Sequence, residues 1–186
     1  NNIANFFSAT LNTYGVFVSA NSTDWTITNN RFYQSATRTY TTANTHRAIS
    51  IATGNNHLVS GNTIGYATSG GTGTYAMAGT IATRFIGIDL SVGTTTATSV
   101  QNNIITAISL GTSSGASTTN GILCGINITA GNVNIGTLTG NTFGATSGTG
   151  AIIATPTTAG GLVVGINCSS TGTIAIANNN FGSLTC

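Results

Sequence analysis

The sequence contains no lysine and no glutamate, and only 3% of its 186 residues are charged. A typical globular domain is about 25% charged. Helices usually present lysine, glutamate, arginine or alanine to water, so a chain without lysine and glutamate is not expected to be helical. Its solvent-facing residues must be threonine, serine, asparagine and glycine, which suit strands and turns. We therefore predict an all-β fold.

Charge and long apolar runs are too scarce for several classes of function. Four arginines and two aspartates give a net charge of +2, whereas a nucleic-acid interface needs clustered basic residues. The sequence has no run of about 18 apolar residues that could form a transmembrane helix. Disorder is disfavoured because Ile, Val, Leu and Phe recur regularly and net charge is small. We expect no nucleic-acid partner and no membrane insertion.

Cysteine is also rare, with Cys124, Cys168 and Cys186 as the three examples. Their spacing matches neither a zinc site nor a CxxC redox motif, so we expect no metal and no cofactor. We interpret Cys124 and Cys168 as small apolar residues that fill a core. A disulfide is the alternative.

One signal recurs five times along the chain: an apolar residue, any residue, Asn or Gly, Asn, any residue, then Ile or Phe. The copies are Ile27-Thr28-Asn29-Asn30-Arg31-Phe32, Val59-Ser60-Gly61-Asn62-Thr63-Ile64, Val100-Gln101-Asn102-Asn103-Ile104-Ile105, Leu138-Thr139-Gly140-Asn141-Thr142-Phe143 and Ile176-Ala177-Asn178-Asn179-Asn180-Phe181. A partial copy opens the chain at Asn1-Asn2-Ile3-Ala4. Such self-similarity is typical of a repeat architecture.

A second signal precedes each full copy. It is a small residue followed by alternating apolar positions, as in Gly15-Val16-Phe17-Val18, Ala48-Ile49-Ser50-Ile51, Gly87-Ile88-Asp89-Leu90, Gly125-Ile126-Asn127-Ile128 and Gly165-Ile166-Asn167-Cys168. From its first apolar residue to the repeated Asn takes 13 to 15 residues. The near-constant distance indicates that both signals belong to one structural unit.

The length of the stretch from the repeated Asn to the next unit varies far more, from 19 to 26 residues across the full copies. It is rich in Thr, Ser and Gly, as in 69–74 and 111–115. We interpret these stretches as surface loops inserted at one corner. The strands of each unit bury their apolar face only if successive units stack and pair.

The two signals resemble the coils of right-handed parallel β-helices of the pectin-lyase-like family, from about Tyr14 to Leu184. The resemblance implies a solenoid of about five coils, in a single segment over residues 1–186. An inward asparagine ladder at a turn is familiar in that family, and here it would consist of Asn30, Asn62, Asn103, Asn141 and Asn179. The fold hosts lyases, hydrolases, phage tailspikes and adhesins, so the resemblance implies no single activity.

Catalytic groups are few. Glycosidases of this architecture need two or three clustered carboxylates, whereas this chain has only Asp24 and Asp89, which the repeat places two coils apart. His46 and His57 have no evident partner, and we expect them in surface loops or corners. We therefore predict that this segment holds no catalytic site.

The outward position of the second signal defines a candidate binding stripe. It contains Phe17, Ser50, Asp89, Asn127 and Asn167. Two interpretations stay open: an ordinary solvated strand face, or part of a face that binds a glycan or a protein partner. Trp25, Tyr33, Tyr40, Tyr66 and Tyr75 could stack on sugar rings, although packing in the core or in loops is the default.

The pattern favours a structural or adhesive segment of a secreted or cell-surface protein, such as a filament, stalk or adhesin. Neighbouring coils or identical subunits would cover its ends, and surface glycans are candidate partners. The opening residues read as the middle of a repeat, so we expect a fragment of a longer or processed protein. Alternatives are a polysaccharide-binding or polysaccharide-degrading protein with its active site elsewhere, and an ice-binding protein. N-glycosylation sequons begin at Asn21, Asn127 and Asn167.

Overall fold

The computed structural model of the chain describes residues 1–20, 22–113, 120–148, 151–158 and 160–186. Its regular elements in these ranges are all β-strands, β1 to β21. The strands pair in parallel and form four sheets, here named A, B, C and D. The described ranges hold no helix long and apolar enough to cross a membrane. The predicted all-β parallel β-helix is confirmed.

Each sheet collects one strand from every turn of the chain. Sheet A contains β1 (Asn2–Ala4), β4 (Arg31–Tyr33), β8 (Thr63–Gly65), β12 (Ile104–Thr106), β16 (Thr142–Gly144) and β20 (Asn180–Gly182). Sheet B contains β2 (Thr13–Val18), β6 (Thr45–Ile51), β10 (Arg84–Ser91), β14 (Leu123–Ala130) and β18 (Val163–Cys168). Sheet C contains β3 (Thr26–Thr28), β7 (Leu58–Ser60), β11 (Thr98–Gln101), β15 (Val133–Ile135) and β19 (Ile174–Ile176). Sheet D contains β5 (Arg38–Thr39), β9 (Tyr75–Ala78), β13 (Ile108–Thr112), β17 (Ile152–Pro156) and β21 (Leu184–Thr185).

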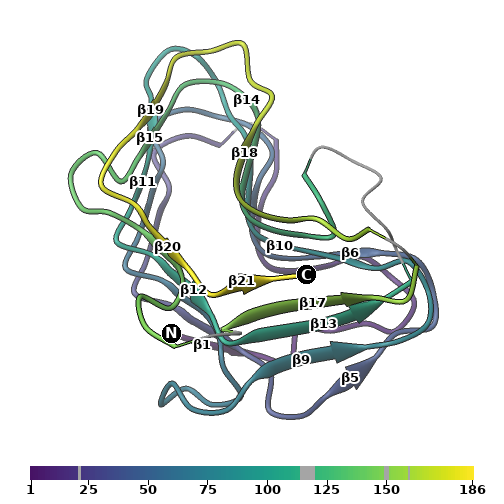
Figure 1. Cartoon of the computed structure of the whole chain (residues 1–186). Coiled ribbons are helices and arrows are strands. Elements are labelled where there is room, and N and C mark those ends of the chain that lie inside the picture. The colour runs from purple at the N-terminus through teal and green to yellow at the C-terminus, as the bar shows by residue number, and fades with distance from the viewer. Residues whose placement is uncertain (21, 114–119, 149–150, 159) are drawn as a thin grey trace.

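The chain visits the sheets in the fixed order B, C, A, D, which defines five coils. Coil 1 consists of β2 to β5, and coil 5 consists of β18 to β21. Figure 1 shows equivalent strands of successive coils stacked on one another, with β19, β15 and β11 on one side and β17, β13 and β9 on another. The partial copy at the start of the sequence is β1, which pairs with β4 and places Ile3 beside Phe32.

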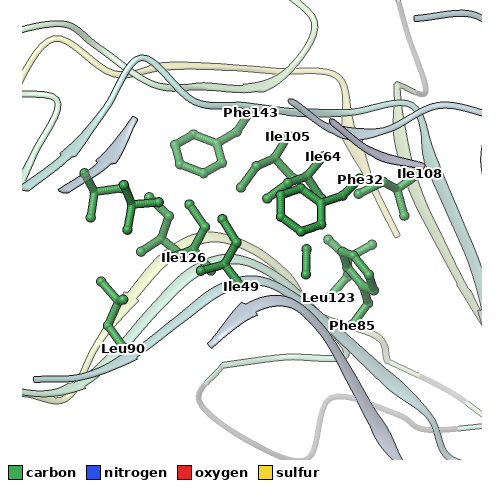
Figure 2. Close-up of a cluster of buried hydrophobic side chains, with 14 of the residues drawn as sticks. Phe32, Ile49, Ile64, Phe85, Leu90, Ile105, Ile108, Leu123, Ile126 and Phe143 are labelled. Atoms are coloured by element: carbon green, nitrogen blue, oxygen red, sulfur yellow. The ribbon is translucent and has the colours of Figure 1, made fainter. Parts of the chain in front are cut away.

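The two sequence signals meet across the core. Figure 2 shows Phe32, Ile64, Ile105 and Phe143 of sheet A facing Ile49, Leu90 and Ile126 of sheet B, and all seven are fully or nearly fully buried. The small residue of the second signal makes room for these large side chains. A Cβ at Gly15 would lie 2.7 Å from the Phe32 ring, and one at Gly125 would lie 2.5 Å from the Phe143 ring.

In four of the five full copies, the corner before sheet A is built by a left-handed residue that precedes the repeated Asn. Asn29, Gly61, Asn102 and Asn178 have φ angles of 55°, 66°, 52° and 56°. Asn and Gly tolerate this left-handed conformation better than other residues do. The turn directs the next side chain, the repeated Asn, into the interior.

The interpretation of the variable stretches as loops is wrong in part, because each stretch also contributes a strand to sheet D. Gly111 and Thr112 belong to β13, and Thr155 and Pro156 belong to β17, although both pairs were expected in loops. Thr112 is completely buried. The strands could not be recognised because some of their inward positions carry a different residue type in each coil, as Met77, Leu110 and Ala154 show.

Candidate functional site

The asparagine ladder has the five residues expected of it, and Asn1 adds a sixth rung. Each side-chain amide donates to the Oδ1 of the Asn in the next coil, at 2.8 to 3.0 Å, from Asn1 through Asn30, Asn62, Asn103 and Asn141 to Asn179. Each Oδ1 from Asn62 onward also accepts the backbone N–H of the preceding rung. Asn62, Asn103 and Asn141 are completely buried. The ladder is a structural element inside the stack.

The candidate stripe lies on the outer face of sheet B in the predicted register. Phe17 pairs with Ser50, Ser50 with Asp89, Asp89 with Asn127, and Asn127 with Asn167. A second outward row runs beside it, through Tyr14, Arg47, Ile86, Cys124 and Val164. Together these two rows form the candidate site, which we call the outer B face.

The outer B face is open at coil 1 and largely covered further along the stack. Phe17 is 52% exposed, whereas Ser50 and Asn127 are 7% and 3% exposed. The alternative of an ordinary solvated strand face is therefore wrong for coils 2 and 4. Asn120, from the connection between β13 and β14, lines a pocket here together with Ser50, Asp89 and Asn127.

A connected set of polar contacts runs along the outer B face. One carboxylate oxygen of Asp89 accepts a hydrogen bond from the Arg47 Nε at 2.5 Å. The other accepts one from the Asn127 Nδ2 at 2.7 Å. Asn167 donates in turn to the Asn127 Oδ1 at 2.8 Å. The Asp89 charge is thus paired and hydrogen-bonded, which offsets its partial burial. Four coils are linked on the outside as they are on the inside.

Two aromatic side chains stand at the open end of this network. Tyr14 and Phe17 stack with ring centroids 4.6 Å apart and planes 26° from parallel. The Arg47 guanidinium lies over the Tyr14 ring at 5.5 Å, within the range of a cation–π contact. Arg47 therefore joins an exposed aromatic platform to a carboxylate.

A pocket of about 300 Å³ adjoins the ion pair. Its polar lining includes Arg47, Asp89, Ser91, Asn120 and Asn127. Its size and its mixture of a charge pair, amides and hydroxyls suit a small polyhydroxylated group rather than a large apolar one.

The other candidate catalytic residues lie apart from this face. Asp24 is in the corner between β2 and β3, where Asn56 and Thr23 donate hydrogen bonds that lower the pKa of its carboxyl group. Asp89 lies two coils further along. The described residues contain no group of three or more His, Cys, Asp or Glu side chains arranged to hold a metal ion.

The histidines were expected in surface loops or corners. That expectation is wrong for His46, a buried residue of β6, and holds for His57, which lies at the corner just before β7. His46 and His57 are each 1% exposed. His46 stacks on Phe7 with centroids 5.2 Å apart and shares a hydrogen bond with the Thr13 hydroxyl. Burial, with a smaller effect from the Arg47 charge, lowers its pKa to about 4. The His57 Nε2 donates a hydrogen bond to the Thr53 carbonyl, and its Nδ1 accepts one from the Trp25 N–H. The ring thereby stabilises the corner before β7.

The interpretation of Cys124 and Cys168 as core residues holds in part for Cys124, which is buried although it lies in the outward row of sheet B. Cys124 is buried, and burial raises the pKa of its thiol to about 12. Cys168 is exposed, at the position in β18 that pairs with the inward Ile128 of β14, and β18 pairs with no further strand among the described residues. All three thiols are free. Sequon residues Asn127 and Asn167 are held in the polar network, and Asn21 lies outside the described residues.

The predicted aromatic residues divide between core and surface. Tyr40 and Tyr75 are buried, whereas Trp25 is 49% exposed. Sequence reasoning missed Tyr14, Arg47 and Asn120 as members of the outer B face. The spacing of Tyr14 and Phe17 across Gly15 could have revealed the first, but Asn120 comes from a connection of variable length and carries no periodic signal.

Comparison of the chain with protein-family models, with curated proteins and with solved structures finds no match.

Proposed function

We propose that this chain is a structural and adhesive segment of a secreted, cell-surface β-helix protein, and that it binds glycans through the outer B face. The observation that carries the proposal is the exposed Tyr14–Phe17 pair, joined through Arg47 to the Asp89–Asn127 network. The segment acts by binding and carries no catalytic step.

Sugar recognition supports this assignment. A sugar ring has one apolar face of C–H groups that packs on aromatic rings, and a rim of hydroxyls that exchange hydrogen bonds with planar polar groups. Tyr14 and Phe17 supply the first surface, and the Arg47 guanidinium, which lies over the Tyr14 ring and lines the adjoining pocket, supplies the second. The site has no net charge because the charges of Arg47 and Asp89 cancel. We therefore expect its ligands to be neutral sugars.

The absence of a carboxylate pair supports a binding role over a hydrolytic one. Both oxygens of Asp89 accept hydrogen bonds from protein groups. Asp24 lies two coils away, which is about 10 Å along the stack at the usual strand spacing. Glycosidases hold their two carboxyl groups about 5 to 9.5 Å apart across one bond, on the same cleft.

A glycan array followed by calorimetry with the best ligand tests the proposal. We expect Tyr14→Ala and Phe17→Ala each to weaken binding about three- to tenfold, the value of one aromatic contact. Phe181→Ala is the matched control, because Phe181 is 50% exposed in the last coil, far from the outer B face of coil 1. No specific glycan, or an equal loss in the control, would count against the assignment.

A further inference from the structure

One asparagine of the chain is followed directly by glycine. Asn120-Gly121 is the single Asn-Gly pair in the sequence, and it lies just before β14, which begins at Leu123. Asparagine loses its side-chain amide most readily before glycine, because glycine has no side chain to hinder attack by its main-chain nitrogen. The Asn120 side chain is partly exposed, so water reaches it.

The fold requires the glycine of this pair. Gly121 has a φ of 67°, in the left-handed region that residues with a side chain rarely adopt. A Cβ at this position would lie 2.3 Å from the Leu162 carbonyl oxygen of the next coil. That carbonyl is held in place, since it accepts the Ile122 N–H at 3.0 Å. A larger residue therefore cannot replace Gly121 and shield Asn120 unless the neighbouring coil moves.

Asn120 also belongs to the pocket of about 300 Å³ on the outer B face. Arg47, Asp89 and Asn127 line the same pocket. The Arg47 Nε donates to one Asp89 oxygen and the Asn127 Nδ2 donates to the other, so the only carboxylate in this lining is matched by one guanidinium. A change of charge at Asn120 would act directly on this balance.

We propose that Asn120 is a deamidation site, and that the carboxylate formed there converts this pocket from neutral to acidic. The Gly121 main-chain nitrogen attacks the Asn120 Cγ and closes a five-membered succinimide ring. The Asn120 side-chain nitrogen leaves as ammonia, taking with it the proton that the Gly121 nitrogen carried. One water then opens the ring at either carbonyl, returns a proton to the Gly121 nitrogen, and leaves aspartate or isoaspartate at position 120.

The product changes which ligands the pocket can accept. Two carboxylates and one guanidinium leave a net charge of −1, and the new carboxylate competes with Asp89 for Arg47. Like charges in one pocket repel, and an added cation relieves that repulsion. The modified pocket therefore disfavours anions and favours groups with an amino function. This inference concerns the chemistry of the pocket and does not depend on the proposed function.

Mass spectrometry of peptides from the aged protein tests the reaction. The full chain is incubated in mildly alkaline buffer and then digested in mildly acidic buffer, in which deamidation is slow. We expect Asn120 to convert about tenfold faster or more than Asn44. Asn44 is the matched reference, because it is also partly exposed in a connection that leads into sheet B, but the β-branched Thr45 follows it.

Asn120→Gln is the control variant for the reaction. Glutamine would have to close a larger ring, so this variant should lose the fast conversion at position 120 and keep the slow one at Asn44. Conversion of Asn120 no faster than that of Asn44 in the wild-type protein would overturn the proposal.

Nuclear magnetic resonance of the arginine side chains tests the effect on the pocket. Asn120→Asp supplies the aspartate product directly, and we expect it to shift the Arg47 Nε–H resonance. Asn134→Asp introduces the same charge on β15 of sheet C, outside the pocket lining, and should leave that resonance in place. An unchanged Arg47 resonance in Asn120→Asp, or an equal shift in both variants, would overturn the conversion to an acidic pocket.

Discussion

Asn103 illustrates how much a single interior side chain contributes to the stack. Its amide donates to Val59 and Asn141, and its Oδ1 accepts the main-chain and side-chain N–H groups of Asn62. All four contacts are sheltered from water. The side chain thereby ties three coils together at one point.

Replacing Asn103 with alanine should destabilise the protein by about 4 kcal/mol, because it leaves several buried polar groups without partners. Chemical denaturation monitored by circular dichroism measures the change in the free energy of unfolding. Asn180→Ala is the control, since Asn180 is exposed in the last coil and its side chain makes no described hydrogen bond. A loss below about 1 kcal/mol for Asn103→Ala would contradict the structural role of the ladder.

His46 makes stability depend on pH. Its folded-state pKa of about 4 is below the ordinary value of 6.5, mainly because burial disfavours the charged ring. The unfolded chain therefore takes up a proton first as the pH falls. Stability from this group is fully present above pH 6.5 and is lost as the pH falls towards 4, by about 3 kcal/mol in all.

Unfolding free energies measured at pH 7 and pH 4 test this expectation. His46→Gln should flatten the pH dependence, since glutamine does not titrate. Asp24→Asn serves as the comparison for the exposed carboxylate, and it should leave the histidine-dependent fall in place. An unchanged pH profile in His46→Gln would show that other groups cause the acid sensitivity.

At the scale of the strand, the small residue of sheet B and the large residue of sheet A form one packing unit. Gly125 lies against the Phe143 ring and also against the Gly165 carbonyl of the next coil. We expect Gly125→Ala to cost about 2 kcal/mol through overpacking. Gly70→Ala, where a new Cβ has no atom closer than 3.7 Å, should change stability by less than about 0.5 kcal/mol.

A double-mutant cycle locates the strain. In the Phe143→Leu background, Gly125→Ala should cost about 1 kcal/mol less than it does in the wild-type protein, because the aromatic ring is gone. The remaining free-energy cost arises from the contact of the new Cβ with the Gly165 main-chain carbonyl, which a side-chain substitution does not remove. Strict additivity of the two substitutions would mean that the two sequence signals do not pack on one another.

The strands that could be predicted from sequence are those whose neighbours impose a repeated residue type. Asn30 and its equivalents must be asparagine to continue the ladder, so sheets A, B and C were visible in the spacing. Sheet D was not, because residues of different shapes, such as Met77, Leu110 and Ala154, occupy the same inward position in successive coils. The burial of Ser50 and Asn127 could not be predicted either, because Asn120, which lines a pocket with them, belongs to no repeated signal.

On the scale of the whole molecule, seven of the ten exposed large apolar side chains among the described residues lie near the two ends of the stack, and Leu58, Ile104 and Leu138 lie in the coils between them. Leu11, Tyr14, Phe17 and Trp25 lie in or before the first coil, and Leu162, Ile176 and Phe181 lie in or just before the last. Coils in between have neighbours on both sides and bury their inward residues. Stability therefore arises from contacts between successive coils, as in other repeat architectures.

The small number of charged residues in the sequence also follows from the stacking of coils. A parallel stack places equivalent residues of neighbouring coils in register, so a charged position repeated in every coil would form a column of like charges about 4.8 Å apart. Arg47 and Asp89 avoid this by pairing with each other across two coils. Serine, threonine and asparagine are uncharged, so they can repeat in every coil without electrostatic repulsion, and they also form hydrogen bonds.

The uniform direction of the ladder amides has a consequence for how such a chain changes length over generations. Each rung from Asn30 to Asn141 accepts an amide hydrogen bond from the rung before it and donates one to the rung after it, so each of these coils presents the same ladder chemistry to its neighbours. A duplicated stretch of the gene that encodes one whole coil can enter between any two others and find compatible contacts on both sides. The ladder is thus compatible with growth of the stack by whole coils.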